Sequence, residues 1–131
     1  MIAIVCVDNK NGVMFNHRRQ SQDKNLTAEI LHMAADKPLY ISSYSKSLFS
    51  DDANVVVVED FNALAESDYA FIEDAILDIP QNRVNSLILC RWNRDYPSDV
   101  KLPFDVADYK LQSSREIKGN SHEKITIEIH F

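Results

Sequence analysis

The chain has 131 residues, 45% hydrophobic and 26% charged, which is the length and composition of one globular domain. Its net charge of −6 argues against a general affinity for nucleic acid or for an anionic membrane surface. The two cysteines, Cys6 and Cys90, lie in separate apolar runs and offer neither a disulfide framework nor metal-ligand spacing. No basic leader or membrane-length apolar run is present. We therefore expect a single cytoplasmic, bacterial-type domain over residues 1–131, with no metal.

The first apolar run, Ile2–Val7, predicts a strand at the centre of a sheet, because a strand that is apolar at every position is typically buried on both faces. Helices should then cover both sides of that sheet. Similar runs predict further strands at 39–42, 55–58, 69–72 and 84–92. In open α/β sheets ligands bind beyond the carboxyl ends of such strands. The residues from Asp8 to about Asp23 are therefore the first candidates for function.

Residues 9–24 are polar and predict a loop after the first strand. A helix should follow from Leu26 to about Ala35, with Asn25 as its N-cap, because apolar side chains recur there at helical spacing. Leu26 and Ile30 should face inward.

The end of the chain changes character, because residues 106–117 and 122–130 alternate between apolar and polar side chains. A turn at 118–121 joins the two segments, which predicts a closing antiparallel hairpin.

Glycine sets a sharper bound on function. The chain has only Gly12 and Gly119, whereas a Rossmann fingerprint or a P-loop needs several glycines beside the phosphates. A Gly-x-Ser-x-Gly nucleophile elbow is absent as well. These motif-based classes of enzyme are excluded.

The order of elements resembles the dihydrofolate reductase family over nearly the whole chain. The matching segments are the first strand with Gly12-Val13-Met14, then Lys37-Pro38 before Leu39-Tyr40-Ile41, then Leu102–Asp105, and finally Gly119–His122 with the alternation to Phe131. This resemblance implies an α/β fold with a mixed, mainly parallel central sheet, flanking helices and a final antiparallel hairpin.

The sequence departs from the family where the cofactor would bind. The resemblance places a phosphate-binding Gly-Arg pair and Thr at Ser43–Lys46, and a Ser-Ser pair at Glu59-Asp60. It also places a Gly-Gly pair at Glu73-Asp74, where two carboxylates would repel a pyrophosphate. We therefore expect no cofactor and no NADPH-dependent reduction of dihydrofolate.

The family's catalytic acid has two possible counterparts. An ungapped count places Leu26 at that position, and a three-residue gap would place Glu29 there. The ungapped count is simpler and favours a lost acid.

The strongest basic cluster of the chain, His17-Arg18-Arg19, falls in the predicted ligand-binding loop. Two guanidinium groups could clamp a carboxylate or phosphate, with Gln20 and Ser21 beside them. The alternative is a solvated loop whose arginines offset nearby acids.

Other candidates lie outside this loop. Tyr44 and Ser45 could line the vacated cofactor groove, and Arg91 could stack on a planar ligand. Each has a plainer interpretation as a turn or packing residue. His122, beside the hairpin turn, is expected to be structural.

Two hypotheses follow. In the first, the protein is a dihydrofolate reductase-like pseudoenzyme that binds a small anionic ligand or a protein partner through the 16–23 loop. In the second, it is an enzyme of other chemistry, with Glu29 or Asp23 as acid-base groups and Arg18 or Arg19 stabilising charge. A residual pterin-type reductase is a further alternative.

Overall fold

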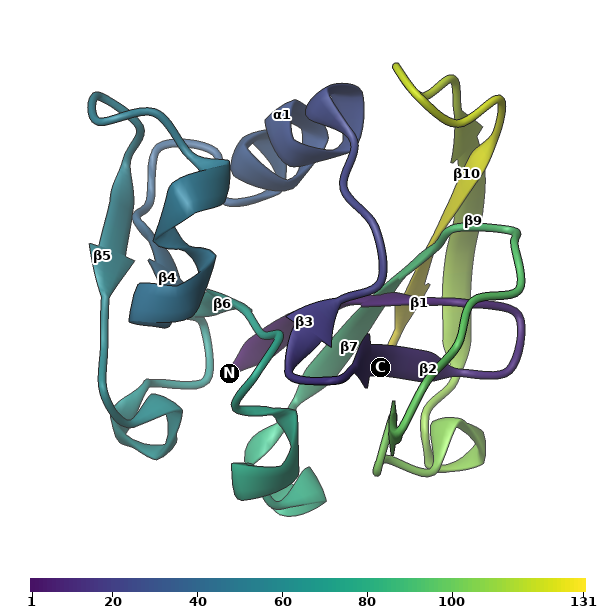
Figure 1. The fold of residues 1–131 in the computed structure, drawn as a ribbon. Coiled ribbons are helices and arrows are strands. Elements are labelled where there is room, and N and C mark those ends of the chain that lie inside the picture. The colour runs from purple at the N-terminus through teal and green to yellow at the C-terminus, as the bar shows by residue number, and fades with distance from the viewer.

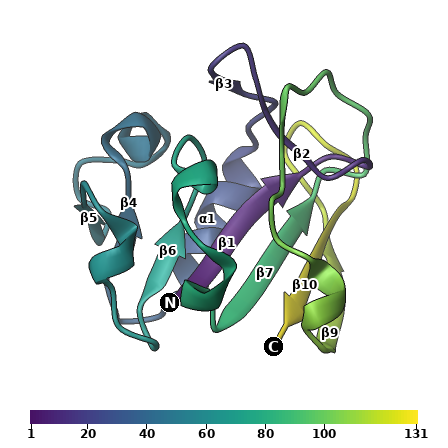
Figure 2. The ribbon, with the colours of Figure 1, turned by 90° about the horizontal axis from the view of Figure 1, so that it is seen from below.

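A computed structural model describes all residues, 1–131, and contains one large sheet with β1 (Ile2–Val7) in its middle. β1 pairs in parallel with a strand on each side, as Figures 1 and 2 show. The prediction of a central first strand is confirmed. In spatial order the seven strands are β5 (Val55–Val57), β4 (Leu39–Ile41), β6 (Tyr69–Phe71), β1, β7 (Ser86–Arg91), β10 (Ile125–His130) and β9 (Leu111–Ile117).

The sheet is parallel from β5 to β7 and antiparallel at its other end, where β10 pairs with both β7 and β9. The predicted mixed sheet and closing hairpin are confirmed. The hairpin is shorter than expected, because residues 106–108 form the 3-10 helix η5 (Val106–Asp108). β9, the last strand at this edge of the sheet, is exposed at every position except Ile117.

Alternate residues of β1 enter two separate cores. Ala3, Val5 and Val7 belong to one core, and Ile4 belongs to the other together with Leu26 and Ile30. The inward orientation of Leu26 and Ile30 is therefore confirmed.

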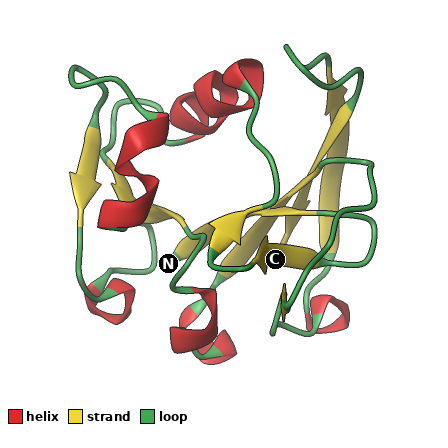
Figure 3. Cartoon of the chain, in the orientation of Figure 1, coloured by secondary structure: helices red, strands yellow, loops and turns green.

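The two faces of the sheet carry different elements. The only α-helix, α1 (Lys24–Met33), covers one face together with the 3-10 helix η1 (Ser43–Leu48) (Figure 3). Short 3-10 helices cover the other face. These are η2 (Phe61–Ala63), η3 (Ile76–Asp78) and η4 (Gln81–Arg83). No helix has the length and apolar character needed to cross a bilayer.

Two local predictions are wrong. The helix begins one residue after Asp23, which caps it by accepting hydrogen bonds from the N–H groups of Asn25 and Leu26, so Asn25 is not the cap. The apolar run at 55–58 is not buried, because β5 lies at the edge of the sheet and leaves Val56 and Val57 about 40% exposed.

The predicted loop at 9–24 is wrong in part, because it contains a hairpin of β2 (Gly12–Phe15) and β3 (Arg18–Arg19). β8 (Val100–Lys101) joins β2 to complete a small second sheet. The turn of this hairpin is Asn16-His17, and both residues have positive φ, 51° and 60°. This backbone conformation matches a two-residue hairpin turn that follows the natural twist of the strands.

Candidate functional site

Three carboxylates are buried around the start of α1 and the carboxyl ends of β1 and β6. They belong to Asp8, Asp23 and Glu73, which are 1%, 4% and 7% exposed. A buried charge is costly unless donors within the protein satisfy it. The donors that satisfy each of these carboxylates define what the region can bind.

Asp8, directly after β1, binds donors that shape the following turn. Its carboxylate accepts hydrogen bonds from the N–H groups of Lys10 (2.9 Å) and Gly12 (2.7 Å) and from Gln20 Nε2 (3.0 Å). Burial alone would raise the pKa of Asp8, but these donors and the N–H of Tyr96 hold it below its ordinary value. Asp8 therefore fixes the small sheet to the large one.

Glu73, after β6, is neutralised by Arg19 of β3. Arg19 Nε lies 2.9 Å from Oε2 and Nη2 lies 3.0 Å from Oε1, a two-point contact between guanidinium and carboxylate. Ser45 Oγ also donates to Oε1 at 2.8 Å. The Arg19 guanidinium lies 4.6 Å from the centre of the Tyr44 ring, and the Tyr44 hydroxyl accepts the N–H of Arg19 at 2.8 Å. We call these four residues the Glu73 cluster.

Asp23 is satisfied mainly by backbone N–H groups. Its oxygens accept from Asn25 and Leu26 at the start of α1, and from the turn that joins β9 to β10. The donors in that turn are the N–H groups of Asn120 (3.0 Å), Ser121 (2.8 Å) and His122 (3.2 Å). Asp23 thus ties the start of α1 to the far end of the chain.

The ring of His122 completes this group, and we call Asp23, His122 and Ser21 the Asp23 cluster. His122 Nδ1 lies 3.1 Å from Asp23 Oδ2, and Nε2 lies 3.1 Å from Ser21 Oγ and 3.0 Å from the Tyr96 hydroxyl. The ring stacks on Trp92 with centroids 4.7 Å apart.

The donors around Asp23 set its charge. Burial would raise its pKa, but the N–H groups of Asn120 and Ser121, the side chain of His122 and the N–H of Leu26 outweigh burial and hold the pKa far below its ordinary value. A carboxyl group that stays ionised and fully hydrogen-bonded is suited to anchoring and poorly suited to accepting and releasing a proton. The predicted acid-base role of Asp23 is therefore not favoured by this geometry.

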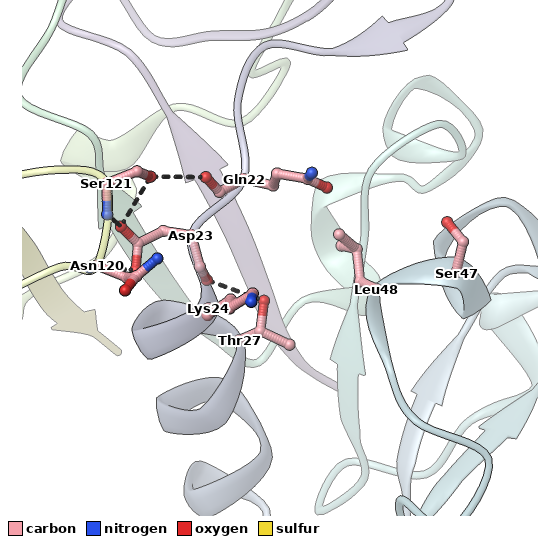
Figure 4. Close-up of a pocket in the computed structure, with 8 residues that line it drawn as sticks. All are labelled: Gln22, Asp23, Lys24, Thr27, Ser47, Leu48, Asn120 and Ser121. Atoms are coloured by element: carbon pink, nitrogen blue, oxygen red, sulfur yellow. Dashed lines mark hydrogen bonds between the residues drawn. The ribbon is translucent and has the colours of Figure 1, made fainter.

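A polar groove of about 460 Å³ opens beside the Asp23 cluster, between the start of α1 and η1 (Figure 4). Gln22 points across it towards Leu48, and Asn120 and Ser121 form the opposite side. Gln22, Asp23, Thr27 and Leu48 also line an apolar hollow below the groove, which has room for about one water molecule. Leu26 lines this hollow.

The other predicted residues lie apart from the groove. Glu29 pairs with Arg115 of β9, and Arg91 is held by Glu128 at 2.8 Å and by Asn11 at 3.1 Å. An ion pair engages each of these side chains.

The basic cluster is divided by the hairpin. The Arg19 side chain is paired with Glu73 and does not join Arg18 in the predicted clamp. The side chains of His17 and Arg18 are exposed and make no hydrogen bond or ion pair in the protein. Gln20 donates to Asp8, and Ser21 contacts His122. Tyr44 and Ser45 meet Arg19 and Glu73.

Sequence reasoning missed the contacts of His122 and Tyr96. His122 lies 101 positions from Ser21, and no local pattern points to such a pair. No group of three or more His, Cys, Asp or Glu side chains is arranged to hold a metal ion.

No protein-family model matches this sequence, and no curated protein matches it either. Its structure is similar to that of a dihydrofolate reductase from Enterococcus faecalis, solved in complex with NADP(H) and RAB-propyl. The TM-score is 0.61 at 10% sequence identity, over 98% of this chain and 94% of that chain. The fold is therefore dihydrofolate reductase-like. Identity this low supports the fold alone.

Proposed function

We propose that this protein does not reduce dihydrofolate with NADPH, and that it binds an anionic ligand at the β2–β3 hairpin. One observation carries the proposal: Arg19 and Glu73 neutralise each other, while Arg18 in the same hairpin stays exposed and unpaired. The Arg19–Glu73 ion pair occupies the place where the cofactor would bind, and Arg18 supplies a free cation.

The argument against the cofactor begins at the carboxyl end of β6. The resemblance places the family's Gly-Gly pair at Glu73-Asp74, where a pyrophosphate would approach the backbone. Here the Glu73 carboxylate is buried and already paired with Arg19, and the Asp74 carboxylate accepts a hydrogen bond from Ser42 Oγ at 2.7 Å. A pyrophosphate would meet the negative charge of Asp74 and would have to displace the Arg19–Glu73 ion pair.

The chain also lacks a suitably placed acid for the reduction of dihydrofolate. Leu26, at the ungapped position of the family's acid, is 1% exposed and lines the apolar hollow. Glu29, the gapped alternative, pairs with Arg115. Neither side chain is placed to deliver a proton into the groove.

The hairpin supports the binding half of the proposal. Arg18 lines a hollow of about 280 Å³ with Phe15, Tyr96 and Pro97, so a cation lies beside aromatic and apolar surface. His17 at the turn is exposed as well. An anionic ligand with a planar apolar part would gain both an ion pair and stacking contact there.

Two titrations test this function. NADPH added to the purified chain should give no saturable binding by calorimetry or by cofactor fluorescence, and a micromolar dissociation constant would contradict the proposal.

A thermal-shift screen of aromatic carboxylates and phosphates should find ligands that raise the melting temperature. Arg18→Ala should weaken their binding at least about tenfold. Arg94→Ala removes an equal exposed charge outside the hollow and should leave affinity unchanged. Equal affinity in Arg18→Ala would place the ligand elsewhere.

A further inference from the structure

A serine, a histidine and an aspartate form one continuous chain of contacts in the Asp23 cluster. Ser21 Oγ lies 3.1 Å from His122 Nε2, and His122 Nδ1 lies 3.1 Å from Asp23 Oδ2. The side chains of His122 and Asp23 are 3% and 0% exposed. Hydrolases of unrelated folds use this order of groups to activate a serine, and they are recognised by geometry rather than by sequence position.

Two segments bring the three side chains together. Ser21 and Asp23 lie just before α1, and His122 lies in the turn before β10. The side chains of Ser21 and Asp23 both contact the imidazole of His122. Trp92 stacks against that ring and holds its plane.

The contact with Asp23 determines which ring nitrogen of His122 carries the proton. The ionised carboxylate can only accept hydrogen bonds, so we assign the proton on the facing nitrogen to Nδ1. Nε2 is then left as an acceptor, directed at the hydroxyl groups of Ser21 and Tyr96. This is the tautomer that a general base for Ser21 requires.

Two small hollows lie beside Ser21, and a larger groove lies next to one of them. Ser21 lines the apolar hollow with Leu26, Phe71 and Trp92, and the polar groove opens directly above this hollow. A second hollow on the other side of Ser21 also has room for about one water, beside Gln20 and Glu73. An acetyl-sized group would enter the first hollow after a shift of the exposed Gln22, and its polar alcohol would stay in the groove.

A donor for the developing negative charge is also at hand. The backbone N–H of Gln22, directly after Ser21, makes no hydrogen bond within the protein. The N–H group that follows the nucleophile is one of the donors that stabilise the oxyanion in α/β-hydrolases.

We propose that Ser21 is the nucleophile of an esterase-type site for small acyl esters, with His122 as general base and Asp23 as the positioning residue. Ser21 Oγ bonds to the carbonyl carbon and passes its proton to His122 Nε2. The carbon–oxygen bond of the ester then breaks, and the departing alcohol takes that proton. Water activated by His122 releases the acid and restores Ser21. This site is distinct from the anion site at the hairpin, and Tyr96 borders both.

A variant of Tyr96 should change the acylation rate in a direction that the proposal predicts. Its hydroxyl lies 3.0 Å from Nε2 and competes with Ser21 for the same lone pair. Tyr96→Phe removes this competitor without removing the ring, so acylation of Ser21 should become faster.

The test uses the full chain and p-nitrophenyl acetate. We expect a burst of nitrophenolate of up to one equivalent, and an acetyl group that peptide mass mapping places on Ser21. Ser21→Ala should lower the acylation rate at least about 100-fold, whereas Ser114→Ala, an exposed serine of β9, should not change it. Tyr96→Phe should raise the rate several-fold.

The contrary results are equally clear. Absence of acetyl-Ser21 in a folded wild-type chain, or an unchanged rate in folded Ser21→Ala, would overturn the proposal. Ser21→Cys gives a second readout if ester turnover is slow, because pairing with His122 should speed its alkylation by iodoacetamide. An alkylation rate equal to that of Ser114→Cys would overturn it as well.

Discussion

Two buried carboxylates, Asp23 and Glu73, are held in opposite ways. Asp23 is satisfied mainly by backbone N–H groups from α1 and from the turn before β10, whereas Glu73 is satisfied by the side chains of Arg19 and Ser45. Backbone donors belong to the fold and cannot turn away. Side-chain donors are free to rearrange. The comparison indicates that Asp23 is an anchor of the fold. The Glu73 cluster is instead a plug, by which we mean a set of side-chain contacts that can open or be replaced.

Asp23→Asn tests the first half of the comparison and should have the largest effect. An amide nitrogen in place of Oδ2 would face the N–H groups of Ser121 and His122, and one in place of Oδ1 would face those of Asn120, Asn25 and Leu26. We expect the free energy of unfolding to fall by about 3 kcal/mol or more, measured with urea. Asp36→Asn, at an exposed position, should stay within about 0.5 kcal/mol. A loss below about 1 kcal/mol for Asp23→Asn would contradict the anchoring role.

Acid should weaken the same anchor in the wild-type chain. The pKa of Asp23 is lowered in the folded state, so its contribution is complete above its ordinary value of 3.8 and is lost as the pH falls below that value. The stability difference between wild type and Asp23→Asn should therefore be constant above about pH 5 and shrink below it. Asp8, whose pKa is also lowered, keeps some acid sensitivity in the variant. A difference that grows as the pH falls would reverse the sign of this argument.

Local patterns predicted the parts of the fold that are decided locally. Six consecutive apolar residues placed β1 at the centre of the sheet, and alternation predicted the antiparallel pairing of β9 with β10. The small sheet was missed because its strands are short and β2 pairs with β8, far along the chain. β5 was expected to be buried, since composition does not say which strand lies at an edge.

The site was less predictable for the same reason. The sequence identified Arg19 as a cation near the strand ends, but its partner Glu73 lies 54 positions away. The sequence suggested that Glu73-Asp74 would repel a pyrophosphate, without indicating that Glu73 would take one of the two arginines out of the predicted clamp. The charged residues of a sequence identify candidate site residues, but which of them form ion pairs depends on the three-dimensional fold.

Arg19 and Glu73 test the second half of the comparison through a double-mutant cycle. Arg19→Met keeps a long apolar side chain against Tyr44 but leaves a buried carboxylate without its cation, so stability should fall by about 2 kcal/mol. Glu73→Gln keeps an acceptor for Ser45 and should lose less. The double variant should recover about 1 kcal/mol of the summed losses. Additive losses would show that the ion pair contributes no coupling and that the plug is held by packing.

Tyr44→Phe should have the smallest effect and separates the two contacts that Tyr44 makes. The variant keeps the ring beside the Arg19 guanidinium and removes only the hydroxyl that accepts the N–H of Arg19 at 2.8 Å. We expect a loss of about 1 kcal/mol by urea unfolding, because this N–H is only partly buried and water can replace the acceptor. Tyr69→Phe, whose hydroxyl makes no hydrogen bond in the protein, should change stability by less than about 0.5 kcal/mol.

The same variant also tests how firmly the plug is closed. If the Tyr44 hydroxyl fixes β3 over Glu73, hydrogen exchange at the Arg19 amide should become faster in Tyr44→Phe, while the amides of Asn120 and Ser121 that bind Asp23 stay protected. Equal acceleration in both places would mean that the two clusters open together. The contrast between a backbone-held anchor and a side-chain plug would then fail, because a single opening event would expose both carboxylates.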